Sequence, residues 1–188
     1  MRKLFAFNMV TLDGFFEGPN GEIDWHNADN EEFNEFAIEQ TGEVDTLLFG
    51  RKTYQLMASY WPTETAINAD PIVADLMNRL SKFVFSRTLE SVEWNNTRLI
   101  HENAQNEIKE LKTQQGKDMA IFGSANLISS IMDVIDEHRV MVNPILLRRG
   151  EPLFKNTGDK IKLQLVNARR FNSGNVLLTY RPFEENTA

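Results

Sequence analysis

Small, hydroxyl-bearing and cationic side chains follow three of the strands that the sequence predicts. The three groups are Gly50, Arg51, Lys52 and Thr53; Ser86, Arg87 and Thr88; and Gly123, Ser124, Ala125, Asn126 and Leu127. Cations, hydroxyl groups and unpaired backbone N–H groups are the partners that proteins use to bind phosphate. Gly123 permits close approach of the backbone to a ligand, and Ser124 is placed to cap the helix that follows. The three groups predict a site for a phosphate-containing ligand if the fold brings them together.

Two of these cations occupy an electrostatically unfavourable position. Arg51 and Lys52 fall in the first turn of a predicted helix, whose N-terminus already carries about half a positive charge. They cost roughly a few tenths of a kcal/mol there unless an anion such as phosphate lies between them and the backbone N–H groups. The alternative is that both extend into solvent or pair with an acid such as Asp45. The segment is not a P-loop, because Gly50 is followed by Arg51 and the G-x-x-x-x-G-K-[ST] pattern is not completed.

The composition excludes several kinds of chemistry. The chain of 188 residues has no cysteine, which excludes disulfides, thiolate catalysis and Cys-ligated metal centres, and its three histidines lie far apart, so we expect no metal. A formal charge of −7 argues against nucleic acid as a partner. No window approaches about 18 consecutive apolar residues, and residues 1–9 lack the features of a secretory signal. We therefore expect a cytoplasmic protein without a membrane partner.

The apolar periodicity predicts strands and helices that alternate within one domain, residues 1–188. The predicted strands are Lys3–Met9, Val44–Phe49, Lys82–Phe85, Thr97–Ile100, Met119–Phe122 and Arg139–Val142, with a closing hairpin of Ile161–Phe171 and Asn175–Tyr180. The predicted helices are a segment capped by Asp29 and ended by Gly42, then Lys52–Trp61, Asp70–Leu80, Asn103–Gln115 and Ser124–Val134. This order predicts a three-layer α/β domain with a mostly parallel sheet and an antiparallel hairpin. Such sheets bind ligands at their carboxyl edge, where a dinucleotide with an additional phosphate would contact all three groups.

Several motifs occur in the order and spacing of the dihydrofolate reductase superfamily. They are Met9–Gly14, Phe49–Tyr54, Phe85–Thr88, Phe122–Leu127 and Pro144–Leu147 with Pro152–Phe154. Over nearly its whole length the chain most resembles the branch that contains the reductase domain of the bifunctional riboflavin-biosynthesis deaminase-reductase, the RibD C-terminal domain. The resemblance implies a dihydrofolate reductase-like α/β/α fold, NADPH as hydride donor, a pterin-like or ribosylaminopyrimidine-like small molecule as substrate, and a homodimer. The deaminase half is excluded, because its zinc site requires cysteine.

The resemblance also implies roles for particular residues. Gly50–Thr53 match the turn under the cofactor phosphates, Ser86–Thr88 match the segment beside the adenosine ribose and its 2′-phosphate, and Gly123–Leu127 match the helix start that holds the diphosphate. The residues expected on the substrate side are Asn8, Met9, Asp13, Trp25 and Glu32. Alternatives remain for three of them. Asp13 can belong to an ordinary turn, Trp25 can lie in the core, and Glu32 shares its predicted helix with Glu31 and Glu35.

Two segments depart from the family pattern. Gly123 is followed by Ser124 where dihydrofolate reductase tends to have two adjacent glycines, and Arg148-Arg149-Gly150 replaces a glycine-rich turn. The two arginines are expected either to recognise a phosphate on the substrate or to lie in solvent. No residue is identified as catalytic. The leading hypothesis is an NADPH-dependent reductase, and the alternative is a non-catalytic nucleotide-binding or interaction module that retains the fold.

Overall fold

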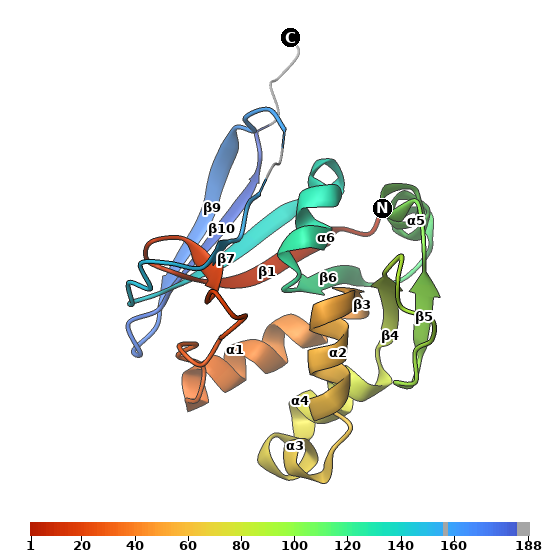
Figure 1. Ribbon diagram of the computed structural model, residues 1–188, viewed down its shortest axis with the longest axis horizontal. Helices are drawn as coiled ribbons and strands as arrows, with labels where there is room; N and C mark the ends of the chain where they lie inside the picture. The colour runs from red at the N-terminus through yellow and green to blue at the C-terminus, as the bar shows by residue number, and fades with distance from the viewer. Residues whose placement is uncertain (156–157, 184–188) are drawn as a thin grey trace.

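The computed structural model describes residues 1–155 and 158–183. They form three layers, in which helices cover both faces of a central sheet (Figure 1). The order of the strands in this sheet is β5-β4-β3-β6-β1-β7-β10-β9. The strands are β1 (Leu4–Thr11), β3 (Val44–Gly50), β4 (Ser81–Phe85), β5 (Thr97–Ile100), β6 (Asp118–Phe122), β7 (Glu137–Asn143), β9 (Leu163–Arg170) and β10 (Val176–Pro182). The helices are α1 (Glu31–Gly42), α2 (Arg51–Tyr60), α3 (Glu64–Ala69), α4 (Pro71–Arg79), α5 (Ala104–Thr113) and α6 (Ala125–Ser130), with a 3₁₀ turn η1 (Met132–Val134).

The sheet is parallel from β5 to β7, and β10 runs antiparallel to both β7 and β9. This confirms the predicted α/β architecture with a mostly parallel sheet and a C-terminal antiparallel hairpin. Strands β4, β3 and β6 are neighbours in the order of the sheet. Because they are parallel, their carboxyl ends lie at the same edge, and the three polar groups that follow them are brought together there.

Strand β1 lies between two apolar cores, because successive side chains of a strand point to opposite faces of the sheet. Phe7 faces a core that includes Phe36 of α1, whereas Ala6 faces a core that includes Ile108 of α5 and Ile128 of α6. Figure 1 shows α1 to α4 on one side of the sheet and α6 on the other. One core therefore lies between the sheet and the helices on each of its two faces, which gives three layers. None of the helices in the described part of the chain is long and apolar enough to cross a membrane.

The first helix begins one residue later than the sequence predicts. Its N-cap is Asn30, whose Oδ1 accepts a hydrogen bond of 2.9 Å from the backbone N–H of Phe33, and not Asp29. Aspartate and asparagine cap helices equally well, so the sequence of two adjacent candidates does not distinguish them. The predicted helix Ser124–Val134 is divided into α6 and η1 at Ile131, which is fully buried and has a non-helical backbone.

A small second sheet was not predicted, because its strands are too short to show a period. It pairs β2 (Phe15–Glu17) with β8 (Glu151–Pro152). Gly150 has a φ of 154°, and a Cβ there would clash with the carbonyl of Glu17, so only glycine fits this approach. Pro144–Leu147 is not a strand, in part because Pro144 lacks the N–H that a ladder needs. The short helix α3 was also not predicted.

Candidate functional site

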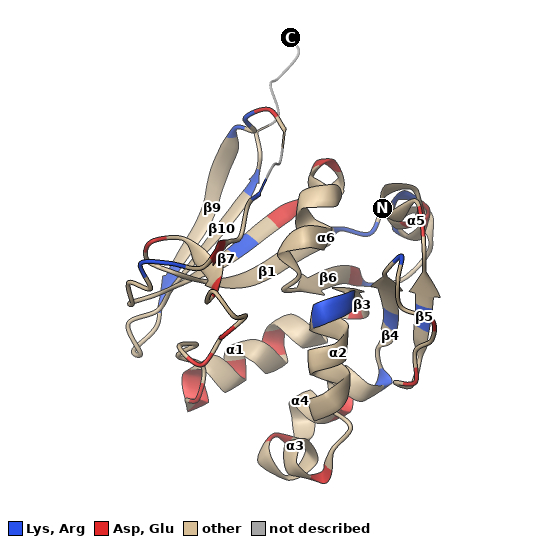
Figure 2. Cartoon of the chain, in the orientation of Figure 1, with Lys and Arg blue, Asp and Glu red and all other residues tan. Residues whose placement is uncertain are grey.

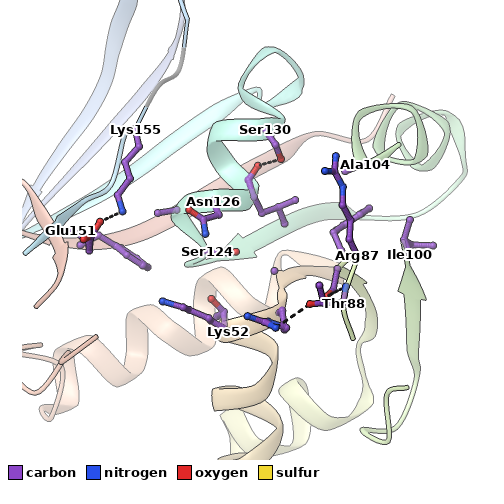
Figure 3. Close-up of a pocket in the computed structure, with 18 of the residues that line it drawn as sticks. Lys52, Arg87, Thr88, Ile100, Ala104, Ser124, Asn126, Ser130, Glu151 and Lys155 are labelled. Atoms are coloured by element: carbon purple, nitrogen blue, oxygen red, sulfur yellow. Dashed lines mark hydrogen bonds and ion pairs between the residues drawn. The ribbon is translucent and has the colours of Figure 1, made fainter. Parts of the chain in front are cut away.

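A cleft of about 1460 Å³ lies at the carboxyl ends of β3, β4, β5 and β6 (Figure 3). All the residues predicted to bind the cofactor line it except Gly123. Gly123 is adjacent to it, because a Cβ at this position would lie 3.5 Å from atoms of both Thr53 and Phe16, which do line the cleft. The fold therefore brings together the three groups that the sequence singled out.

The floor of the cleft depends on close contact between the ends of two strands. Gly50 ends β3, and a Cβ on it would clash with the hydroxyl oxygen of Ser124, which follows β6. Gly123 and Ser124 have consecutive positive φ values of 80° and 76°. The backbone at both positions therefore keeps a conformation that glycine favours, although the second residue is a serine and not a glycine.

The helices that begin at the cleft are distinguished by their missing side-chain caps. The N-cap residues of α2, α5 and α6 are Gly50, Asn103 and Ser124, and none of them makes a side-chain cap hydrogen bond. The N-cap residues of α1, α3 and α4 are Asn30, Thr63 and Asp70, and each accepts a hydrogen bond from the first turn of its helix. The expected cap at Ser124 is therefore wrong. Three helix starts without side-chain caps therefore line one cleft.

The cations of the cleft are arranged around these helix starts. Figure 2 shows positive charge at the start of α2, where Arg51 and Lys52 lie. Arg51 donates a 3.0 Å hydrogen bond to the Thr88 hydroxyl, and Lys52 Nζ lies 3.6 Å from Glu17 Oε1. Neither cation pairs with Asp45, but Lys52 is largely exposed and lies beside the acid Glu17, as the alternative expects for this residue. Asp45 binds Arg2 and the backbone of Lys117 instead.

Arg87 is the most available of these cations. It is exposed, and within the described residues it makes no hydrogen bond or ion pair. Its side chain extends from the end of β4 toward Ala104 at the start of α5 (Figure 3). The turn that carries it is held by Ser86, whose hydroxyl accepts hydrogen bonds from the N–H groups of Thr88 and Leu89 at 3.3 and 3.0 Å. Ser86 orders the backbone, and Arg87 is free to bind an anion.

The opposite end of the cleft carries a second group of charges. Glu151 of β8 pairs with Lys155, and this hydrogen bond lowers the pKa of the Glu151 carboxyl. Sequence reasoning missed these residues, and it also missed His101–Asn106 after β5. His101–Asn106 could have been predicted in the same way as the other three groups, because this polar segment follows a parallel strand and leads into a helix. Glu151 left no such signal, because β8 has only two residues.

None of the residues expected on the substrate side lines this cleft. Met9 is buried under α1, and Asn8 is buried on the opposite face of the sheet. Trp25 is half-buried and donates a 3.2 Å hydrogen bond to the Glu22 carbonyl, so it lies neither in the core nor in the cleft. Glu32 accepts a 2.7 Å hydrogen bond from the backbone N–H of Asn172.

Asp13 connects two loops. Its carboxylate accepts hydrogen bonds from the Thr11 hydroxyl at 2.6 Å and from the backbone N–H groups of Leu147 and Arg148 at 3.1 and 2.8 Å. The Thr11 hydroxyl is the main cause of a lowered Asp13 pKa. Arg148 has a positive φ of 67°, and its side chain and that of Arg149 are exposed. Asp13 therefore fixes the turn in which the chain departs from the family pattern.

Comparisons with known proteins identify the family of the chain. The model of the RibD C-terminal domain matches residues 2–177. The chain is 36% identical over 182 residues to the uncharacterized protein YyaP of Bacillus subtilis, covering 95% of this chain and 94% of that protein.

Two solved structures share the fold. One is the diaminohydroxyphosphoribosylaminopyrimidine deaminase/5-amino-6-(5-phosphoribosylamino)uracil reductase of Thermotoga maritima, with a TM-score of 0.68, 15% identity and coverage of 97% of this chain and 57% of that one. The other is the dihydrofolate reductase of Enterococcus faecalis complexed with NADP(H), with a TM-score of 0.65, 14% identity and coverage of 97% of both chains. The protein belongs to the RibD C-terminal domain family and has the dihydrofolate reductase-like fold.

Proposed function

We propose that the protein is an NADPH-dependent reductase that transfers a hydride to a pterin-like or ribosylaminopyrimidine-like small molecule. The observation that carries this proposal is the cleft at which three uncapped helix starts meet Arg51, Lys52 and Arg87. An extended dinucleotide has phosphate groups along its length, so it can use several such partners at once. The reductase and dihydrofolate reductase that share the fold support the same reading.

The residues present fit a diphosphate at the centre of the cleft. Gly50 and Ser124 approach each other closely there, so the backbone N–H groups at the starts of α2 and α6 lie on either side of the contact. Lys52 has an exposed ammonium group that pairs only loosely with Glu17, at 3.6 Å. A diphosphate bound to these N–H groups would remove the repulsion between the helix and the cations of its first turn.

Arg87 is suited to the additional phosphate that distinguishes NADPH from NADH. It has no partner among the described residues, and it stands beside Thr88, which Arg51 already holds. A guanidinium group binds a phosphate through two parallel hydrogen bonds. Arg87 is therefore our candidate for selecting the phosphorylated cofactor.

NADPH, when bound, supplies the hydride. The contribution of the chain is to position the reacting groups, because hydride transfer needs little covalent help from protein. Thr53, Phe16 and Gly123 meet where the cleft reaches the end of β6. The accompanying proton comes from an acidic group or an ordered water.

The test is a titration with NADPH followed by a turnover screen. We expect micromolar binding of NADPH and loss of NADPH absorbance with at least one compound from a panel of dihydrofolate, dihydropterins and ribosylaminopyrimidine phosphates. NADPH binding without turnover of any compound would favour the non-catalytic module. Failure to bind NADPH would contradict the proposal itself.

We also propose that the protein forms a homodimer through β9. This strand ends the sheet, so one of its edges has unpaired backbone groups. Apolar side chains are exposed on or near it by 42–51%: Leu163, Leu165, Val166 and Phe183. Pairing with a second copy would satisfy the edge and cover these side chains.

A further inference from the structure

The end of the cleft opposite Arg87 is lined by two glutamates on neighbouring strands. Glu17 of β2 and Glu151 of β8 are direct partners in the small antiparallel sheet, and both line the cleft. Like charges directly opposite each other on adjacent strands are destabilising unless cations offset them. Two lysines that line the same cleft, Lys52 and Lys155, provide this compensation.

Each of these lysines is engaged by one of the glutamates. Lys155 donates a hydrogen bond to Glu151, and Lys52 Nζ lies 3.6 Å from Glu17 Oε1. The hydrogen bond from Lys155 is the main cause of the lowered Glu151 pKa, and the charge of Lys52 adds to it. Figure 3 shows the Lys155 and Glu151 side chains pointing toward each other, at the end of the cleft away from Arg87. Each positive charge at this end is therefore matched by a carboxylate.

The arginines of the neighbouring turn do not add a free cation. Arg148 and Arg149 do not line the cleft, and their side chains are exposed. Asp13 accepts a hydrogen bond from the backbone N–H of Arg148. The Glu22 pKa is lowered chiefly by a hydrogen bond from Asn20 and also by the charge of Arg149, which places Arg149 near Glu22. Within the described residues, this end of the cleft has no cation without an acid beside it.

A cofactor at the other end would leave these acids less compensated. The proposed site uses Lys52 for the diphosphate, and a bound diphosphate would draw Lys52 away from Glu17. Glu17 and Glu151 would then share Lys155 alone. The cleft of about 1460 Å³ exceeds the roughly 300–1,000 Å³ of a typical site for one small molecule, which leaves room for a second reactant beside the cofactor. That reactant would meet more carboxylates than cations.

The next step rests on the proposed function and names the class of its substrate. We propose that Glu17 and Glu151 exclude phosphorylated molecules from this end of the cleft, so that the compound that accepts the hydride has no phosphate group. A phosphate binds to arginine, lysine or backbone N–H groups, and here the lysines are already engaged. Contacts that penalise the wrong ligand create specificity as well as contacts that favour the right one. Dihydropterins and dephosphorylated ribosylaminopyrimidines fit this end, whereas their phosphorylated counterparts do not.

The first test is a titration with inorganic phosphate in the absence of cofactor, followed by backbone amide NMR signals. The signals of Arg51 and Ala125 report on the starts of α2 and α6, and that of Lys155 reports on the acidic end. The variant is Glu151→Gln, which removes the charge and keeps the size of the side chain. The matched control is Glu110→Gln, at an exposed position of α5.

We expect phosphate to shift the signals at the starts of α2 and α6 in all three proteins. In the wild type and in Glu110→Gln, the Lys155 signal should not respond. In Glu151→Gln, phosphate should bind beside Lys155 at least about tenfold more tightly than in the wild type, because the lysine loses its acid. Phosphate binding beside Lys155 in the wild type, or no gain in Glu151→Gln, would overturn the inference.

The second test uses two compounds that differ only by a phosphate, 5-amino-6-(5-phosphoribosylamino)uracil and its dephosphorylated form. Calorimetry in the presence of NADP⁺ gives the affinity for each. We expect the wild type to bind the dephosphorylated form at least about tenfold more tightly, and both Glu17→Gln and Glu151→Gln to reduce this preference. Equal affinity, or a preference for the phosphorylated compound, would overturn the inference. If neither compound binds, the phosphate titration decides, because it needs no particular substrate.

Failure of this inference is distinguishable from failure of the proposed function. If phosphate leaves the signals at the starts of α2 and α6 unchanged, the cofactor site is rejected, whatever happens at Lys155. If phosphate shifts those signals and also binds beside Lys155 in the wild type, the cofactor site is kept. In that case only the exclusion of phosphorylated substrates is rejected.

Discussion

Gly50 and Ser124 meet where β3 and β6 end, and a Cβ on Gly50 would clash with the Ser124 hydroxyl. Gly50 has an ordinary φ of −82°, so alanine is allowed by the backbone and excluded only by this contact. Ser124 has a positive φ of 76°, which glycine adopts without strain. The floor of the cleft therefore requires glycine at position 50 and would accept glycine in place of Ser124.

We predict that Gly50→Ala destabilises the fold by about 1–3 kcal/mol through overpacking and weakens NADPH binding. Adding Ser124→Gly should recover most of both losses, since it removes the clashing hydroxyl. Denaturant unfolding and NADPH titration of the single and double variants measure this coupling. Independent, additive effects of the two substitutions would contradict the contact.

Asp13 should make stability depend on pH. Hydrogen bonds, chiefly from Thr11, hold its pKa below 3.8 in the folded protein, so its carboxylate stabilises the fold at neutral pH and this contribution is lost as the pH falls through the lowered pKa. Asp13→Asn should therefore be less stable than the wild type near pH 7, by a margin that shrinks as the pH falls below 3.8, the pKa of an unperturbed aspartate. Urea midpoints across this range measure the margin, with Asp24→Asn as a control at an exposed position. A margin independent of pH would refute the assignment.

Lys82 should also make stability rise with pH, but in the alkaline range. It is 1% exposed, donates to the carbonyls of Met77, Asn78 and Leu80, and burial lowers its pKa from 10.5 to about 8. Between these values the unfolded chain binds more protons than the folded protein, so stability should rise with pH by up to about 3 kcal/mol.

The variant that tests this dependence is Lys82→Met. It should be less stable than the wild type, because the three carbonyls lose their donor, and the contribution that rises between about pH 8 and 10.5 should be absent. Lys109→Met, at an exposed position on α5, serves as the control. A rise of equal size in Lys82→Met would assign the dependence to another group.

The homodimer proposal predicts that Leu165→Lys dissociates the protein into monomers. A charge placed on an exposed apolar position of an edge strand opposes pairing with a second copy. Leu56→Lys is the matched control, because Leu56 on α2 is 50% exposed and Leu165 is 51% exposed. Light scattering would give the masses of all three proteins. A monomeric wild type, or a Leu165→Lys variant that stays dimeric, would reject this interface.

The grouping of the polar segments at the cleft could be anticipated from the sequence, because each of these segments is short and continuous. Arg51 and Lys52 follow an apolar strand directly, and the rule that parallel strands share a carboxyl edge places Arg87 and Ser124 beside them. Local patterning and one topological rule were sufficient for this half of the site.

The other half depends on contacts between distant segments, which leave no local pattern. Glu32 has the spacing of a candidate substrate ligand, yet its role is set by the backbone of Asn172, 140 residues away. Asn175 reaches Asn27 across 148 positions. The residues that the sequence placed on the substrate side do not line the cleft, and their role in substrate binding stays a prediction.

The proposed function rests on NADPH binding in the cleft and on its selection through Arg87. The most direct measurement is the affinity of the wild type, Arg87→Ala and Arg79→Ala for NADPH and NADH, followed by tryptophan fluorescence. Arg79 is an exposed arginine on α4 that pairs with Asp75, so its variant controls for the loss of a surface charge. We predict that Arg87→Ala weakens NADPH binding at least about tenfold, leaves NADH binding nearly unchanged, and differs in this from Arg79→Ala. Equal loss of affinity for both cofactors, or no loss for either, would show that Arg87 does not select NADPH.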